Sequence, residues 1–362
     1  MSTKRPFNVS SLFIRQENSI REAMDCIDRN HKGIALIVDD ESRLLGTITD
    51  GDVRRAILAG KSLGTSVSEL LDNKAKAGAV TPISVSVGTD SLTLLKLMQQ
   101  HGINQIPVVD PEGRVVDLVI LSELLPDHGL QLKAVIMAGG YGTRLRPLTD
   151  DLPKPMLPVG GRPLMETILQ QLQQAGVRNV NVMTHFKSEK IIEYFGDGRK
   201  FGLELSYVNE DRPLGTGGSL GLLNVPDEPL LVMNGDILTG VDIKAMLAYH
   251  HESRADMTVG IRRYEIQVPY GVIECEGSKI CSLNEKPDLS FYVNAGIYII
   301  EPSVYQHMPI GEHFNMTDLI QWLINAKANV VGFPIREYWL DIGQHEDYMQ
   351  AQEDVLNGKV PI

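Results

Sequence analysis

The stretch from Leu132 to Leu164, LKAVIMAGGYGTRLRPLTDDLPKPMLPVGGRPL, constrains this chain more than any other. It begins with an apolar run at 133–137, which has the length of a buried strand. Three of the next five residues are glycines, and Arg144, Arg146 and Lys154 follow. Glycine lets backbone N–H groups approach a ligand without obstruction by Cβ, and successive N–H groups form an anion site. The order of strand, glycine loop and fixed cations predicts a site for the phosphates of a nucleoside triphosphate.

Three other structures would also use a glycine cluster. A dinucleotide-binding fingerprint has a third glycine at the position of Leu145 and usually no cation at the phosphate. A P-loop needs a Gly-Lys-Ser/Thr sequence, which this stretch lacks. A structural turn with solvated arginines explains neither the second arginine nor a lysine held between two prolines. The residues therefore favour the triphosphate site.

This stretch resembles two signatures of the sugar-1-phosphate nucleotidyltransferases. The run 139–145 matches their glycine loop, and 153–158 (PKPMLP) matches their second signature. The resemblance implies an α/β domain over 133–362, with a Rossmann-like, mixed and mainly parallel sheet. It makes Arg144 and Lys154 the catalytic cations at the triphosphate. It also implies a set of nucleotide-binding loop residues, which are Ala138, Gly139, Gly140, Gly142 and Thr143.

Residues 1–128 contain an internal repeat. The segment 34–39 aligns with 105–110, and each copy shows the order helix, strand, turn, strand, helix. A two-fold repeat of this shape resembles a tandem pair of CBS domains, which would form a small regulatory α/β module. The polar Pro/Gly segment 126–131 is the best domain boundary, with 129–132 as the linker.

The CBS resemblance implies an adenosine-type ligand, possible regulation and a homo-oligomer. In the first copy it implies that Thr49 and Asp52 hold the ligand. The alternative is that Thr49 only caps a helix beginning near Asp50 and nothing binds. The second copy departs from the pattern, because its corresponding residues are Asp117, Ile120 and Glu123.

Two aspartates are candidates for a magnesium site. Asp236 follows the apolar run 230–234, and ligands of open α/β sheets bind beyond the carboxyl ends of strands. Taken by itself, Asp236 is favoured as the cap of a helix beginning at Ile237. Asp341, in the sequence WLDIG, resembles the late aspartate of the nucleotidyltransferases, which shares the metal with the first. Mg²⁺ is bound by one or two carboxylates plus substrate phosphates.

A second glycine loop, 213–218, resembles the segment under the nucleobase, with Gly215 and Thr216 as nucleotide-binding residues. Without the resemblance, it is an ordinary strand–helix turn. In the family, the residue four before the loop's leucine reads the base, and here it is Glu210. A carboxylate can accept both adjacent donors of guanine, whereas uracil and thymine suit an amide better. Glu210 therefore favours GTP, although the amino group of cytosine would also satisfy it.

Four residues resemble the sugar-phosphate side of the family. The alternatives are a surface salt bridge for Glu285 and Lys286, and an edge-strand turn for Asn294. The motifs follow one another in the family's order, which favours the binding role. The residues are Gly271, Glu285, Lys286 and Asn294.

Composition limits the partners and the location. The net charge of −12 argues against nucleic-acid binding. No apolar run approaches the ~20 residues that span a membrane, and the N-terminus does not resemble a signal peptide. The three scattered cysteines predict reduced thiols in a cytoplasmic protein. The histidines lack metal or triad spacing, so they are predicted to be structural.

The resemblance to the nucleotidyltransferases implies an enzyme that makes a nucleotide sugar and pyrophosphate from a nucleoside triphosphate and a sugar 1-phosphate. The fused CBS pair resembles guanylyltransferases of bacterial surface-sugar pathways, including those that use glucosamine 1-phosphate. Mannose 1-phosphate is the second choice of sugar, and cytidylyl or uridylyl transfer the second choice of base. A non-catalytic nucleotide sensor is the alternative from another class.

Overall fold

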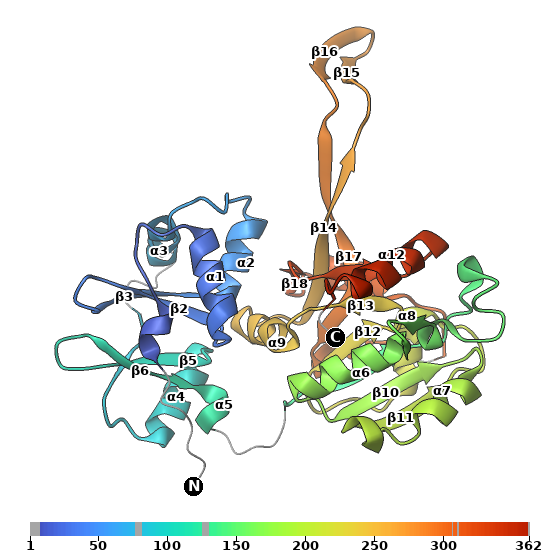
Figure 1. Ribbon diagram of the computed structural model, residues 1–362, viewed down its shortest axis with the longest axis horizontal. Coiled ribbons are helices and arrows are strands. Elements are labelled where there is room, and N and C mark those ends of the chain that lie inside the picture. The colour runs from blue at the N-terminus through green and yellow to red at the C-terminus, as the bar shows by residue number, and fades with distance from the viewer. Residues whose placement is uncertain (1–7, 77–81, 125–129, 306, 310, 361–362) are drawn as a thin grey trace. The chain divides into compact units, whose positions relative to one another are not determined.

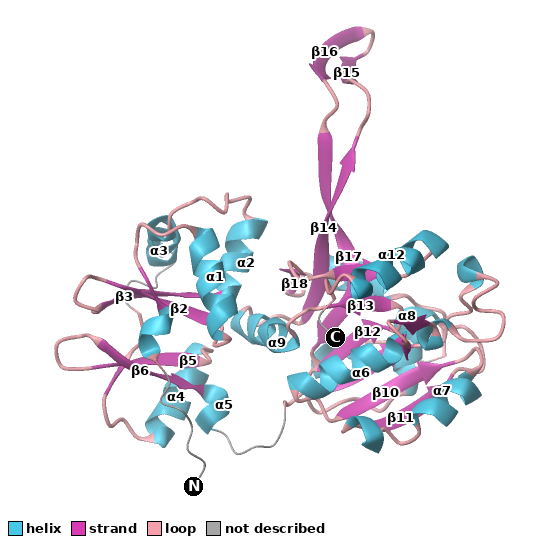
Figure 2. Cartoon of the chain, in the orientation of Figure 1, coloured by secondary structure: helices cyan, strands magenta, loops and turns pink. Residues whose placement is uncertain are grey.

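In the computed structural model the described residues are 8–76, 82–124, 130–305, 307–309 and 311–360. They form two compact units. The first comprises Met1–Gly129 and Lys244–Arg254, and the second comprises Leu130–Ile243 and Ala255–Ile362. Figures 1 and 2 show the elements of each. Of the expected boundary segment 126–131, residues 126–129 lie outside the described residues. No helix in the described part of the chain is long and apolar enough to cross a membrane.

The first unit contains two copies of one α/β motif, as the repeat predicts. In the first copy β1 (Phe13–Ile14) pairs in parallel with β2 (Ile34–Val38), which pairs antiparallel with β3 (Leu44–Thr49). The second copy repeats both pairings with β4 (Val85–Ser86), β5 (Gln105–Val109) and β6 (Val115–Ile120). The helices of this unit are η1 (Val9–Leu12), α1 (Ile20–Asn30), α2 (Asp50–Leu58), α3 (Val67–Lys76), α4 (Ser91–His101), α5 (Leu121–Leu124) and most of α9 (Ile243–Glu252). One hydrophobic cluster takes side chains from both copies, so the copies share part of their core.

The second unit is built on a seven-stranded sheet of order β11-β10-β7-β12-β17-β14-β18. Four of its ladders are parallel and the two that involve β17 are antiparallel, which confirms the mixed, mainly parallel sheet. The strands are β7 (Lys133–Met137), β10 (Asn179–Thr184), β11 (Glu204–Asn209), β12 (Leu230–Asn234), β14 (Met257–Gln267), β17 (Asp288–Ile300) and β18 (Val330–Pro334).

The second unit also contains ten helices and three two-stranded ladders among its described residues. The helices are η2 (Thr143–Leu145), η3 (Lys154–Met156), α6 (Leu164–Ala175), α7 (Ser188–Phe195), η4 (Arg199–Phe201), α8 (Gly215–Gly218), η5 (Ser219–Leu222), α10 (Pro302–Tyr305), α11 (Met316–Asn325) and α12 (His345–Leu356). The two-stranded ladders join β8 (Pro158–Val159) to β9 (Arg162–Pro163), β13 (Ile237–Thr239) to β19 (Trp339–Asp341), and β15 (Val272–Glu276) to β16 (Lys279–Asn284).

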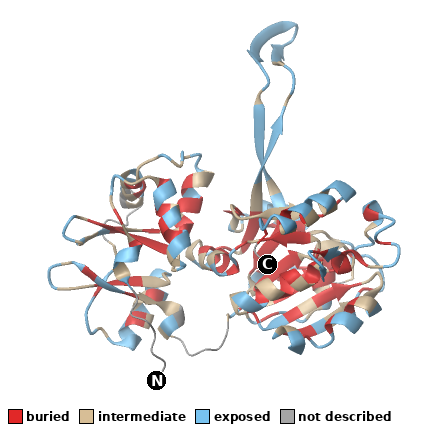
Figure 3. Cartoon of the chain, in the orientation of Figure 1, coloured by how far each residue is buried: buried red, intermediate tan, exposed pale blue. Residues whose placement is uncertain are grey.

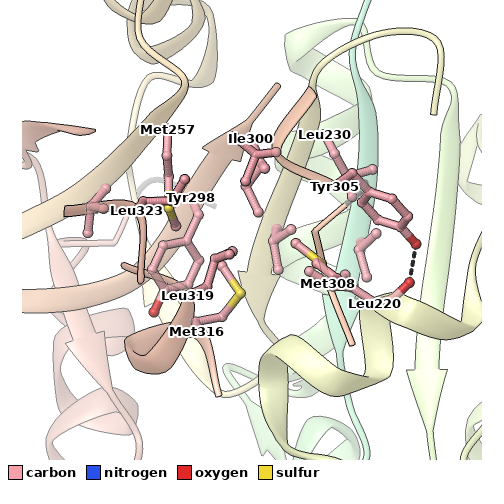
Figure 4. Packing of buried hydrophobic residues seen from close by; sticks show 14 of the residues in the cluster. Leu220, Leu230, Met257, Tyr298, Ile300, Tyr305, Met308, Met316, Leu319 and Leu323 are labelled. Carbon is pink, nitrogen blue, oxygen red and sulfur yellow. Dashed lines mark hydrogen bonds between the residues drawn. The ribbon is translucent and has the colours of Figure 1, made fainter. Parts of the chain in front are cut away.

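Burial of apolar side chains fixes the centre of the sheet. In β7 the residues 134–136 are almost fully buried, as a strand covered on both faces requires. Figure 4 shows the cluster in which the sheet packs against α11, through Tyr298, Leu319 and Leu323. Full burial of one such side chain stabilises the fold by roughly 1.5–3 kcal/mol. The same figure shows the Tyr305 hydroxyl donating to the carbonyl oxygen of Leu220.

Candidate active site

The carboxyl ends of β7 and β12 bring two predicted site segments together. The strands are parallel neighbours, and Asn234 lies opposite Met137. The Gly235 N–H donates to the Met137 carbonyl oxygen at 2.8 Å. A Cβ at position 235 would lie 2.7 Å from that oxygen, so only glycine allows the strands to end this close together. The glycine loop and the Asn-Gly-Asp segment therefore leave the sheet side by side.

The segment after Asp236 is a strand and not a helix. Residues Ile237–Thr239 form β13, which pairs with β19, and Ile237 lies opposite Asp341. The Ile342 N–H also donates to the Asp236 carbonyl oxygen at 3.0 Å. The helix-cap alternative for Asp236 is therefore wrong, because the residues after Asp236 form a strand that pairs with β19. This pairing brings Asp236 and Asp341 close together from segments about a hundred residues apart.

The electrostatics of this pair fit a cation. Loss of hydration raises the pKa of Asp341, and the negative charge of Asp236 raises it further. The Asp236 Oδ1 atom is buried and has no hydrogen-bond partner among the described residues. Two crowded carboxylates with one unsatisfied oxygen suit Mg²⁺, which takes few protein ligands and leaves room for phosphates. No group of three or more His, Cys, Asp or Glu side chains with metal-site geometry occurs in the part of the chain that the structure describes.

Two predicted catalytic cations adjoin the carboxylates. The Lys154 Nζ donates to the Asp236 Oδ2 at 2.5 Å, and only 8% of Lys154 is exposed. The positive charge of Arg144 favours the ionised form of Asp341. The loss of hydration and the charge of Asp236 outweigh it, so the pKa of Asp341 is still raised. Leu145, next to Arg144, is buried in one cluster with Ile342, which anchors the arginine beside β19. The structure thus gathers Arg144, Lys154, Asp236 and Asp341 from four segments.

The glycine loop contains a tight turn at Gly142, and one of its predicted binding residues is engaged by the sheet. Gly142 has φ +62°, and a Cβ there would lie 2.8 Å from Thr149 Cγ2. The Thr149 hydroxyl donates to the Gly142 carbonyl oxygen at 2.8 Å and fixes the turn. The engaged residue is Ala138, whose N–H donates to the Met183 carbonyl oxygen at 2.8 Å. The Ala138 N–H is therefore already used, which leaves the glycines and the exposed Thr143 as the candidates for phosphate binding.

His185 is a further site residue that the sequence analysis placed among the structural histidines. Its Nδ1 lies 2.7 Å from the Glu210 carbonyl oxygen and must donate to it. Its Nε2 lies 2.8 Å from the Tyr141 hydroxyl, within hydrogen-bond distance. Tyr141 belongs to the glycine loop, so the imidazole ring ties this loop to the start of the second glycine loop. No spacing rule reveals such a link, because it joins segments on neighbouring strands.

Glu210 is a buried loop anchor as well as a candidate base reader. It is 7% exposed, and its Oε2 accepts from the Leu214 N–H at 3.1 Å. One of its two oxygens is thus engaged by the loop itself. The second loop is also tied down, because the N–H groups of Gly217 and Gly218 donate to the Phe314 carbonyl oxygen and the Thr216 hydroxyl accepts from Met316. Gly215 packs against Phe314 with φ +76°.

The four predicted sugar-phosphate residues divide into two groups. Asn294 lies close to the end of β12, because its Oδ1 accepts from the Gly296 N–H, and Gly296 packs against Asn234. Gly271, Glu285 and Lys286 lie together instead on the extension formed by β14–β17 and the β15–β16 hairpin. The Lys286 N–H donates to the Tyr270 carbonyl oxygen at 3.3 Å. Within the described residues, no hydrogen bond or ion pair joins this group to Lys154 or the aspartates.

In the first unit, Thr49 and Asp52 form a capping box on α2. Asp52 accepts from Lys74 at 2.7 Å and from Arg55 at 2.8 Å. Burial of Asp52 opposes ionisation, but these two cations leave its pKa below the usual value. The cap is therefore present, and it leaves the ligand prediction open. In the second copy Glu123 pairs with Lys32 at 3.2 Å.

Comparison with known proteins assigns both parts of the chain. Residues 133–358 match the nucleotidyl transferase family, and 5–59 and 77–126 match the CBS domain. The chain belongs to the nucleotidyl transferase family. The CBS match confirms the repeat, and the nucleotidyl transferase match covers the stretch that holds the gathered cations and carboxylates.

Relatives of the nucleotidyl transferase domain act on different sugar phosphates. The chain is 34% identical over 240 residues to the mannose-1-phosphate guanylyltransferase of Mycobacterium tuberculosis, covering 64% of this chain and 66% of that protein. It is 31% identical over 227 residues to the D-glycero-alpha-D-manno-heptose 1-phosphate guanylyltransferase of Aneurinibacillus thermoaerophilus, covering 62% and 98%. A Bacillus anthracis structure named as a glucose-1-phosphate thymidylyltransferase matches with TM-score 0.51 and 25% identity, covering 61% and 94%. The chain thus spans just under two thirds of the mycobacterial relative's length.

Proposed function

We propose that this chain transfers a nucleoside monophosphate from a nucleoside triphosphate to a sugar 1-phosphate, giving a nucleotide sugar and pyrophosphate. The main support is the convergence of Arg144, Lys154, Asp236 and Asp341 beside the glycine loop. A family member without activity would have no use for two cations and two crowded carboxylates at one place. The relatives named above carry out this class of reaction according to their names.

The proposed reaction is a single in-line displacement. An oxygen of the sugar phosphate attacks the α-phosphorus, one P–O bond forms, and the bond to pyrophosphate breaks with its electron pair. The attacking oxygen is ionised at neutral pH, so no general base is needed. Lys154 neutralises charge on the α-phosphate, and Arg144 binds the departing phosphates through its planar fork. When bound by Asp236 and Asp341, Mg²⁺ would supply Lewis acidity at the phosphate oxygens.

We propose GTP as the nucleotide and a hexose or hexosamine 1-phosphate as the acceptor. Support for guanine comes from the carboxylate of Glu210 and from two relatives named as guanylyltransferases. Glu210 would read guanine through its Oε1, because Oε2 is held by Leu214. Another relative, from Synechocystis, is named a UTP–glucose-1-phosphate uridylyltransferase, so uridylyl transfer is the alternative.

Pyrophosphate release in Mg²⁺ tests this proposal. The purified chain is assayed with the four ribonucleoside triphosphates and dTTP against glucosamine, mannose and glucose 1-phosphates. Turnover with GTP and one sugar is expected. Turnover only with another triphosphate would keep the reaction and refute the role of Glu210. Absence of turnover with every pair would refute the reaction.

We also propose that the first CBS copy binds an adenine nucleotide through Thr49 and Asp52. Arg55 bonds Asp52 at 2.8 Å and reaches Glu252 of α9 at 3.5 Å, so a ligand that takes Asp52 competes for this arginine. Calorimetry with AMP, ADP and ATP is expected to show binding that Asp52→Asn removes. Equal binding by the variant would refute the assignment.

We propose a cytoplasmic location for this chain. The exposed cysteines Cys275 and Cys281 are free thiols, which agrees with this proposal.

A further inference from the structure

Strand β17 is irregular where its exposed extension joins the central sheet. Asn294 is the last exposed residue of the strand, and the six residues after it are buried (Figure 3). Val259 of β14 lies opposite Tyr298. Two residues further along β14, Ile261 lies opposite Asn294, which is four residues from Tyr298 along β17. Strand β17 therefore carries extra residues at this step, and we call residues 294–296 the bulge.

The bulge packs against the residues that flank Asp236. Gly296 has φ +70°, a left-handed conformation that favours glycine. A Cβ at this position would lie 2.6 Å from Asn234 Nδ2 and 2.7 Å from Ile237 Cδ1. Only glycine therefore allows the bulge to come this close to the end of β12 and the start of β13.

A hydrogen bond joins the bulge to the segment that carries Asp341. The indole Nε1 of Trp339 donates to the Ala295 carbonyl oxygen at 2.9 Å. Trp339 lies two residues before Asp341 on β19, which pairs with β13. The bulge is thus held by contacts from both segments that carry the proposed metal carboxylates.

The amide group of Asn294 is held at both ends. Its Oδ1 accepts from the Gly296 N–H at 3.0 Å, and its Nδ2 donates to the Tyr298 hydroxyl at 2.8 Å. A backbone N–H can only donate, so the contact with Gly296 determines which end of the amide is the oxygen. The amide keeps one acceptor lone pair and one N–H for a ligand, and a sugar hydroxyl can use either.

Tyr298 is itself fixed by packing. Its side chain is 3% exposed and lies in the hydrophobic cluster that Figure 4 shows. Burial raises the pKa of the Tyr298 hydroxyl, so this group stays protonated near pH 7. Phenylalanine at this position would keep the packing and would leave the Nδ2 end of Asn294 without this partner. The hydroxyl can therefore be removed without removing the ring that fills the core.

We propose that Tyr298 is a positioning residue that holds the Asn294 amide in the orientation that binds a hydroxyl of the acceptor sugar. The bulge keeps this amide at a fixed place relative to the two aspartates. In-line attack needs such a fixed relation, because a misplacement of about 1 Å can cost roughly a hundredfold in rate. The inference rests on the proposed reaction and names a residue that controls how its acceptor is bound.

The test measures binding of the sugar 1-phosphate, which does not require turnover. Calorimetry with glucosamine, mannose and glucose 1-phosphates uses the full chain with Mg²⁺ and the α,β-methylene analogue of GTP or of UTP, which cannot release pyrophosphate. Tyr298→Phe is expected to weaken binding of the preferred sugar about threefold to tenfold, as expected for one lost neutral hydrogen bond. The affinity for the nucleotide analogue should stay unchanged, because the lost bond lies on the sugar side.

Two further variants separate positioning from packing. Tyr305→Phe removes another buried tyrosine hydroxyl from the same cluster, one that bonds the Leu220 carbonyl oxygen, and should bind the sugar like the wild type. Asn294→Ala removes the amide itself and should weaken sugar binding more than Tyr298→Phe does. Because Tyr298 acts through Asn294, the double variant should bind no more weakly than Asn294→Ala alone. Urea unfolding checks that every variant is folded under the binding conditions.

The other outcomes overturn the inference or the reaction separately. Wild-type sugar affinity in Tyr298→Phe refutes the inference. A loss that Tyr305→Phe reproduces, or that adds to the loss in Asn294→Ala, assigns Tyr298 to packing and also refutes it. A wild type that binds none of the three sugar phosphates refutes the acceptor site and the inference together. A wild type that binds a sugar phosphate but releases no pyrophosphate from any triphosphate refutes the reaction alone, and the affinities of the variants still decide the role of Tyr298.

Discussion

Replacement of Lys154 by methionine separates the catalytic charge from the packing of this residue. The variant keeps an unbranched stem of similar length between Pro153 and Pro155 and removes only the ammonium group. The Lys154 Nζ lies 2.5 Å from Asp236 Oδ2, beside the proposed position of the α-phosphate. Removal of one well-placed group that stabilises transition-state charge costs about 2.7–4 kcal/mol, or roughly 10²–10³ in kcat. We expect a loss of that size, with a much smaller change in the KM for the sugar phosphate.

The cost to folding should be smaller. The Asp236 side chain is 29% exposed, so water takes over part of the lost ion pair. We expect the free energy of unfolding to fall by about 1–2 kcal/mol, between the values for surface and buried pairs. Lys133→Met is the matched control, because its Nζ also bonds a carboxylate at 2.5 Å, that of the exposed Asp227. The control should keep full activity and lose little stability, because an ion pair with an exposed carboxylate contributes little.

The assay combines steady-state pyrophosphate release with urea unfolding of the same preparations. A Lys154→Met enzyme whose kcat stays within tenfold of the wild type would refute the role of this ammonium group. A fall in kcat that Lys133→Met reproduces would show a general effect on the domain instead.

Three further predictions concern other parts of the chain. Asp341→Asn should raise the Mg²⁺ concentration needed for half-maximal activity by at least about tenfold, measured by metal titration, because one of two carboxylates is lost; an unchanged titration would exclude Asp341. His185→Phe keeps the ring but loses both hydrogen bonds, so the KM for the triphosphate should rise about tenfold while kcat changes less; equal changes in both would point to a catalytic role. The lowered pKa of Asp52 means that its stabilising pairs with Lys74 and Arg55 are complete above its usual pKa of 3.8 and are lost as pH falls through the lower folded value. The Tm gap between wild type and Asp52→Asn should therefore narrow in acid, and a constant gap would contradict this assignment.

Sequence patterns of short range predicted most of the fold. The apolar run 133–137 and the glycines behind it gave a buried central strand and a tight loop, because both depend on local residue types. The repeat of 34–39 at 105–110 predicted the two CBS copies, because each copy can be recognised from its local residue pattern. The second aspartate, Asp341, was placed only by resemblance, and the structure explains its position through the pairing of β13 with β19.

Long-range contacts set the limits of prediction from sequence. The residues after Asp236 could have formed a helix, and only the pairing with β19, formed by residues about a hundred positions away, makes them a strand. The link from His185 to Tyr141 and the bond from Glu210 to Leu214 likewise depend on the folded loops. The sequence also did not predict that Lys286 lies on the extension of β14 and β17, apart from the aspartates. The alternation of apolar and polar residues within these strands does not show which side chains are contacted by other elements.

The most direct test of the central claim is ³¹P NMR of the complete reaction. The chain is mixed with Mg²⁺, GTP and the preferred sugar 1-phosphate, and all phosphorus signals are followed together. The account predicts that pyrophosphate and a nucleotide-sugar diphosphate appear in equal amounts while GTP and sugar phosphate disappear. Formation of inorganic phosphate or GMP without the diphosphate, or spectra that do not change, would contradict it.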